Sequence, residues 1–306
     1  MLVIASLVLA QAVGGGAGGS GGRRPAECAD DGGRRPNVWE RAKSPELRRY
    51  CDLLASASSK LAGPSPLPAA ALEAASQADR TMPGRGAPLV LEGRALAALG
   101  RLPEALAALS EGKARDPRSC DDPLALLALA RVLAGTGHTA DASGAYRALL
   151  PRAAALPGAD RTLVAVEAGL VAMDAGPGGL DEATADLREA LREAGQSDAE
   201  RFIVLALALA LDRAGKSEEA AALLGERSRG DPRNVVGSWV PRAGVPVSPA
   251  EAAALCALAL ERLDPAGARD QWEEHLRAAP GGRWAEHARH HLAALAGARP
   301  RRGAPP

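Results

Sequence analysis

A pattern of two short helices joined at a glycine recurs along the chain. Its clearest copy spans residues 89–117 and reads LVLEGRALAALGRLPEALAALSEGKARDP, with Gly100 at the joint and Pro117 at the end. Repetition with a period in the thirties is typical of helical solenoids, in which each helical pair buries its apolar face only against its neighbours. We therefore predict an all-α repeat fold, and we expect function to reside on a surface, with no catalytic residues.

The second helix of each unit carries an alanine followed four residues later by a larger side chain, which places both on one helical face. The pairs are Ala105 with Leu109, Ala142 with Tyr146, Ala183 with Leu187, Ala220 with Leu224, and Ala268 with Trp272. The first helix of most units carries a small residue twelve positions before that alanine, namely Gly93, Ala130, Ala208 and Cys256, and Gly169 lies two positions further out. We expect the two helices of each hairpin to approach closely where these small residues meet.

These features resemble the tetratricopeptide repeat family in their small crossing residues, turn glycines and closing prolines. The turn glycines are Gly100, Gly137 and Gly215, and the prolines are Pro83, Pro117, Pro232 and Pro280. The resemblance implies a right-handed superhelical solenoid of antiparallel helix hairpins with a C-terminal capping helix. It also implies a non-enzymatic scaffold that needs no cofactor and binds a partner protein or peptide in the concave groove.

Carried onto this sequence, the resemblance assigns the groove to side chains of the first helices. They are Val90, Arg94, Leu127, Arg131, Met173, Phe202, Leu205 and Arg213. Arg94 and Arg131 would pair with carboxylates of the partner. The alternative is that both are ordinary solvated arginines of a helix surface.

The repeat pattern also divides the chain into segments. We predict a degenerate N-terminal repeat over residues 37–85, four repeats over 86–234, and a fifth repeat with the capping helix over 249–297. Residues 235–248 contain Trp239, prolines and β-favouring valines, which predict an inserted loop or a small hairpin. Residues 13–36 are expected to form a flexible Gly-rich lead-in, and residues 298–306 a disordered tail.

The N-terminal residues 1–12 read MLVIASLVLAQA and end in the small-x-small form of a signal peptidase site. This predicts export to the periplasm or the extracellular space, with no integral membrane segment after cleavage, because a spanning helix needs about 20 apolar residues. The alternative is an apolar N-terminus on a cytoplasmic protein. In an oxidising compartment, Cys28 and Cys51 could form a disulfide that staples the N-terminal repeat.

The charge balance bears on the class of partner. The chain has 37 basic and 37 acidic residues and a formal net charge of zero, so no field of one sign is available to attract nucleic acid. We therefore expect a protein or peptide partner and no nucleic acid. The more specific version of this function is a component of an envelope assembly or secretion machine.

Four of the five histidines lie near the C-terminus, at positions 275, 287, 290 and 291. His287 and His291 are four residues apart, the spacing at which two imidazoles on one helix can share a metal ion. No glutamate follows the first histidine and the sequence places no third ligand, so the pattern favours a solvated terminal helix without a metal. A metal-binding or hydrolytic protein that uses this histidine cluster remains the alternative from another functional class.

Overall fold

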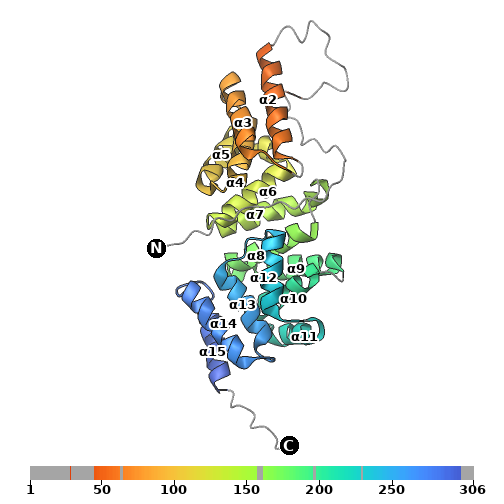
Figure 1. Ribbon diagram of the computed structural model, residues 1–306, viewed down its shortest axis with the longest axis vertical. Coiled ribbons are helices and arrows are strands. Elements are labelled where there is room, and N and C mark those ends of the chain that lie inside the picture. The colour runs from red at the N-terminus through yellow and green to blue at the C-terminus, as the bar shows by residue number, and fades with distance from the viewer. Residues whose placement is uncertain are drawn as a thin grey trace, which may run out of the picture. The chain divides into compact units, whose positions relative to one another are not determined.

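The structure is a computed structural model that describes residues 28, 45–62, 65–156, 161–195, 198–228 and 230–297 (Figure 1). Within these ranges every regular element is a helix, which confirms the all-α prediction. The predicted signal peptide, most of the predicted lead-in and the predicted tail lie outside the described residues. The helices fall into two units, which meet in sequence between Val164 and Ala165.

The first unit consists of three helix hairpins. In these hairpins α2 (Pro45–Leu61) packs on α3 (Pro68–Thr81), α4 (Gly86–Ala98) on α5 (Leu102–Arg115), and α6 (Pro123–Gly135) on α7 (Thr139–Leu149). The short 3-10 segments η3 (Pro117–Cys120) and η4 (Leu150–Ala155) follow α5 and α7. The hairpins coincide with the predicted degenerate repeat and the first two regular repeats.

The second unit contains three more hairpins and two single helices. The hairpins are α8 (Arg161–Ala175) with α9 (Leu180–Ala194), α10 (Asp198–Arg213) with α11 (Ser217–Arg227), and α13 (Pro249–Leu260) with α14 (Pro265–Ala278). The 3-10 turn η5 (Pro177–Gly179) joins α8 to α9. The single helices are α12 (Pro232–Ala243), which lies against α10 and α13, and α15 (Ala285–Gly297), which packs on α14 where the sequence predicts a capping helix.

Small residues allow the helices of a hairpin to touch. A Cβ atom added to Gly93 would lie 2.5 Å from Cγ of Leu109 and 3.1 Å from the carbonyl oxygen of Ala105. In the next unit, a Cβ atom added to Gly169 would lie 2.6 Å from Cγ of Leu187. Each glycine therefore faces the large side chain that the repeat pattern pairs with an alanine, as the sequence predicts.

The hairpin turns depend on glycine for a different reason. Gly100, Gly137 and Gly215 have φ angles of +75°, +83° and +75°, a left-handed conformation that other residues rarely adopt. After each glycine the next amide reaches back to the helix; the N–H of Arg101, for example, donates to the carbonyl of Leu96 at 3.0 Å. This arrangement ends the first helix and reverses the chain.

Helix α12 corrects the predicted organisation. Residues 235–243, expected to be an inserted loop or small hairpin, belong to this helix, and only residues 244–248 connect it to α13. The carboxylate of Asp231 accepts the N–H of Arg233 at 3.0 Å, Pro232 occupies the first turn, and Gly244, at a φ of +67°, ends the helix.

Tertiary packing explains why this segment is a helix although its valines favour a strand. Val236 and Trp239, three residues apart, lie on the buried side of α12, and the Trp239 ring stacks on Phe202 of α10 with 4.4 Å between ring centroids. Burial of this apolar face stabilises a helix more than intrinsic propensity favours a strand.

The cysteines have two kinds of environment. Cys28 and Cys51 form a disulfide with an S–S distance of 2.00 Å, the pairing that the sequence singles out, and it anchors Cys28 to α2. Cys120 and Cys256 are buried free thiols, and burial raises the pKa of both, that of Cys256 to about 11. A buried protonated thiol is unreactive.

Candidate functional site

The side chains assigned to the groove do not form one exposed surface. Arg94 and Arg131 are half-buried. The other six are at most 9% exposed, namely Val90, Leu127, Met173, Phe202, Leu205 and Arg213. The assignment of the five apolar side chains to the groove is therefore wrong, because they belong to the protein core.

Three of the buried side chains have clear partners inside the fold. Val90 lies in the cluster that holds the α4 and α5 hairpin together, and Trp239 covers Phe202. Arg213 donates two hydrogen bonds to the carboxylate of Glu251, at 2.7 and 3.0 Å. Positions that an isolated hairpin would expose are thus covered by neighbouring helices. The charge of Arg213 is paired with that of Glu251 inside the fold.

Arg94 differs from Arg213, because its guanidinium does not bond to a carboxylate of any residue that the structure describes. The side chain is half-buried on α4, and among the described residues no hydrogen bond or ion pair satisfies its guanidinium. Burial lowers the pKa of Arg94, and the negative charge of Asp122, at the start of α6, opposes this shift. Arg94 therefore carries a partly desolvated charge that a ligand could neutralise.

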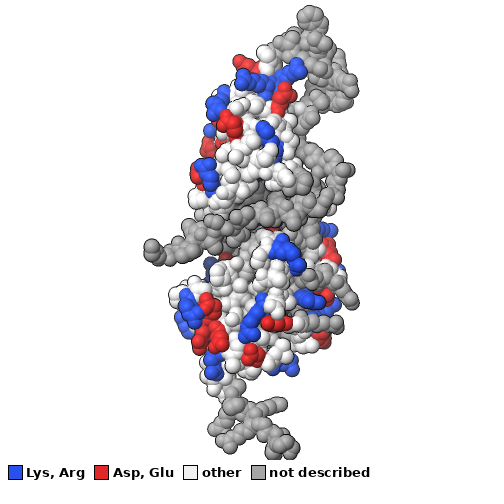
Figure 2. Space-filling model, in the orientation of Figure 1, with Lys and Arg blue, Asp and Glu red and all other residues white. Residues whose placement is uncertain are grey.

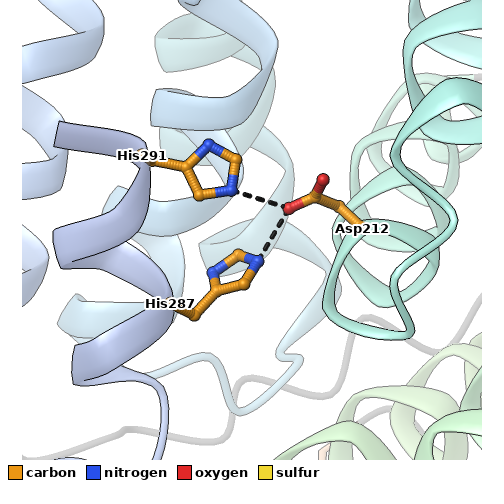
Figure 3. Close-up of side chains that lie close together, drawn as sticks. All are labelled: Asp212, His287 and His291. Carbon is orange, nitrogen blue, oxygen red and sulfur yellow. Dashed lines mark hydrogen bonds and ion pairs between the residues drawn. The ribbon is translucent and has the colours of Figure 1, made fainter. Parts of the chain in front are cut away.

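A second group of side chains meets at the end of α10 (Figure 3). His287 and His291 extend from α15 toward Asp212, and their Nε2 atoms lie 2.7 and 2.9 Å from the same oxygen, Oδ2, of Asp212. The prediction of a solvated terminal helix is therefore wrong for these two histidines. His290 on the same helix is exposed, as predicted.

Neighbouring side chains fix the orientation of the His291 ring. Its Nδ1 atom lies 2.7 Å from Oε1 of Glu261, and the same oxygen accepts the indole N–H of Trp272 at 2.8 Å. The Trp272 ring stacks on the imidazole with 4.7 Å between centroids. His287 has less support, since its Nδ1 atom is buried and has no hydrogen-bond partner among the described residues.

The three titratable groups shift one another's pKa values. Burial of Asp212 favours its neutral form, but hydrogen bonds from His287 and His291 outweigh this and hold its pKa well below the usual range. Burial opposes the charged form of His291, yet the hydrogen bonds to Asp212 and Glu261 raise its pKa to about 9. Burial lowers the pKa of His287 by more than Asp212 raises it. At neutral pH the group thus contains an imidazolium, a neutral imidazole and a carboxylate.

Sequence reasoning missed Asp212 as a member of this group. It lies 75 and 79 residues from its two histidine partners, so no local spacing connects them. One signal was available: Asp212 ends an apolar run that reads FIVLALALALD, and a carboxylate in such a helix requires a buried partner.

No family model and no curated protein matches this chain. Solved structures that are similar include a tetratricopeptide repeat protein from Parabacteroides merdae, at 17% identity and a TM-score of 0.43, where the match covers 81% of this chain and 99% of that one.

Two further solved structures are YrrB, described as a tetratricopeptide repeat protein with an unusual peptide-binding site, and TTC0263 of Thermus thermophilus. YrrB is 15% identical with a TM-score of 0.42, and the match covers 72% of this chain and 99% of YrrB. TTC0263 is 22% identical with a TM-score of 0.36, covering 69% and 98%. The chain's own hairpins, with small residues at their crossings and left-handed glycines at their turns, give it a tetratricopeptide-like helical repeat fold.

Proposed function

We propose that this chain is a non-enzymatic scaffold that binds a segment of a partner protein, and that the first unit recognises an acidic group of that segment through Arg94. The observation that carries the proposal is that Arg94 is half-buried and that, among the described residues, no hydrogen bond or ion pair engages its guanidinium, although Asp122 acts on its charge from a distance. Stacked helical hairpins present a surface built from many short elements, which suits the recognition of an extended or helical peptide.

The chemistry of the partner follows from the state of Arg94. Removing a charged group from water without giving it a hydrogen-bond partner is unfavourable. A carboxylate on the partner would accept two parallel N–H bonds from the guanidinium, and such bidentate pairs are among the strongest hydrogen bonds in proteins. The segment should therefore present an aspartate, a glutamate or a C-terminal carboxylate to α4.

The distribution of surface charge supports a protein partner over nucleic acid. On the face drawn in Figure 2, basic and acidic side chains are intermingled. Among the described residues, several surface charges form ion pairs, such as Arg101 with Glu104 and Arg188 with Glu219. A surface of this kind gives no extended positive field along which a phosphate backbone could bind.

We further propose that the scaffold works in the periplasm or outside the cell, as part of an envelope assembly or secretion machine. The cleavage-like sequence of residues 1–12 supports export, and the Cys28–Cys51 disulfide is of the kind that persists in oxidising compartments. In the part of the chain that the structure describes, no helix has the length and apolar character needed to cross a bilayer. N-terminal sequencing of the chain from its host tests this placement, and an intact Met1 on cytoplasmic protein would contradict it.

Charge reversal at Arg94 tests the binding proposal. The partner is first identified by crosslinking and mass spectrometry in the native host, and its affinity is then measured by calorimetry. Arg94→Glu, alone and with Arg131→Glu, should weaken binding at least tenfold, because one buried charge-assisted pair becomes a repulsion. Arg118→Glu, at an exposed position of the same unit, is the matched control and should bind normally. Unchanged affinity of folded Arg94→Glu would refute the assignment.

A further inference from the structure

The cluster at the end of α10 goes beyond what a scaffold requires. The Nε2 atoms of His287 and His291 are both directed at Oδ2 of Asp212, and the three candidate ligand atoms all lie within 4.8 Å of one another. The carboxylate is buried, while the side chains of His287 and His291 are 18% and 14% exposed. An ion could therefore reach the group from solvent.

We propose that Asp212, His287 and His291 form a binding site for a divalent transition metal, with Zn²⁺ as the ion that matches their donor set. Imidazole nitrogen and carboxylate oxygen are common zinc ligands, and three protein ligands leave a fourth position for water or another donor. The two histidines provide the same-face spacing seen in the sequence, and Asp212 provides the third ligand that the sequence did not place.

The distances require only a small adjustment. In a tetrahedral zinc site with bonds of about 2.0–2.2 Å, neighbouring ligand atoms lie roughly 3.3 Å apart. Here the two Nε2 atoms lie 2.7 and 2.9 Å from Oδ2 of Asp212. Replacing the bridging protons by a metal ion therefore needs an opening of about half an ångström at each contact, which rotation of the side chains can provide.

The surroundings of His291 match those of a metal ligand. In metal sites, the nitrogen that does not bind the ion usually donates its proton to a carboxylate, which fixes the tautomer and orients the ring. Glu261 occupies this place, 2.7 Å from Nδ1 of His291. The indole N–H of Trp272 holds the same carboxylate oxygen, so the ring is oriented with Nε2 toward Asp212 before an ion arrives.

A bound ion would also link two helices of the second unit. It would take one lone pair from each of the three side chains, in place of the protons that now bridge the imidazoles and Oδ2 of Asp212, and so join α15, through His287 and His291, to α10. We therefore expect metal binding to stabilise the C-terminal end of the second unit.

The test uses the full chain, stripped of metal with a chelator and dialysed. Titration with Zn²⁺ in a calorimeter should give one site per chain, and Co²⁺ as a probe should give the intense visible absorption of a tetrahedral site. Zn²⁺ should raise the thermal unfolding midpoint of the wild type. His287→Ala and His291→Ala should each weaken zinc binding at least a hundredfold and abolish the rise.

The control is His290→Ala, on the same helix at an exposed position, which should bind zinc as the wild type does. Circular dichroism shows whether each variant is folded, and the wild-type titration decides the matter even if a histidine variant unfolds. Absence of zinc heat and of a cobalt spectrum in the wild type would overturn the proposal. So would zinc affinity that survives in folded His287→Ala and His291→Ala, or that is lost equally in His290→Ala.

Discussion

The close crossing of α4 and α5 yields a quantitative prediction for Gly93→Ala. Alanine normally stabilises a helix interior by about 0.5–1 kcal/mol relative to glycine. At this position the new methyl group would lie 2.5 Å from Cγ of Leu109, whose side chain is fully buried, and 3.1 Å from a backbone carbonyl of α5. Overpacking of this kind costs about 1–3 kcal/mol. We therefore expect a net loss of about 1–2 kcal/mol in the free energy of unfolding.

Gly144→Ala is the matched control, because Gly144 lies within α7 and an added Cβ would meet nothing within 4 Å. It should stabilise the protein by about 0.5–1 kcal/mol, so the two substitutions have opposite signs. Urea unfolding followed by circular dichroism measures both, and amide exchange in α4 and α5 locates the loss. In a Leu109→Ala background the clash with the leucine side chain is removed and only the 3.1 Å contact with the Ala105 carbonyl remains, so Gly93→Ala should destabilise the protein less than it does in the wild type. A Gly93→Ala variant as stable as the wild type would refute the close-crossing argument.

Two further predictions concern the second unit. Because the pKa of His291 is raised to about 9, its stabilisation, about 3 kcal/mol at most, is complete below its ordinary pKa of 6.5 and is lost as the pH rises through 9. The lowered pKa of His287 acts on the acid side, since only the unfolded chain binds that proton just below pH 6.5. The metal-free protein should therefore be most stable near pH 6–7 in urea titrations, and a stability that rises steadily from pH 6 to 9 would contradict these assignments. Trp239→Ala should cost about 3 kcal/mol and speed amide exchange across α12, because it removes the ring stacked on Phe202; unchanged exchange would show that this stack does not hold α12.

The repeat architecture could be predicted from sequence because its determinants are local. Gly100 ends a helix through its own φ angle, and Gly93 and Leu109 are only 16 positions apart within one hairpin. A side chain that packs against the next turn or the next helix leaves a periodic trace in the sequence. For this reason the sequence predicts the hairpins and the terminal helix. It does not predict α12, which belongs to no hairpin and packs on α10 and α13 instead of on a repeat partner of its own.

The candidate sites could not be predicted in the same way, because they depend on contacts distant in sequence. The repeat pattern assigns Phe202 to a groove, whereas Trp239 stacks on it, and the sequence predicts a solvated His291, whereas Asp212 lies 2.9 Å from its Nε2 atom. Exposure at a given repeat position is decided by what the neighbouring helices cover. The repeat pattern therefore does not show which positions are buried by a helix that is not part of a repeat, such as α12.

Packing against neighbouring helices leaves the charged residues of the two units in different states. In the second unit, Arg213 and Asp212 sit side by side at the end of α10, and each is bonded within the fold, to Glu251 and to the histidines of α15. A charge that is already paired gains little from a partner protein, whereas a carboxylate with two imidazoles gains from a cation. In the first unit, Arg94 is half-buried without such a pair. Peptide recognition should therefore depend on Arg94, and metal binding on Asp212, so that substitutions at one site leave the other function intact.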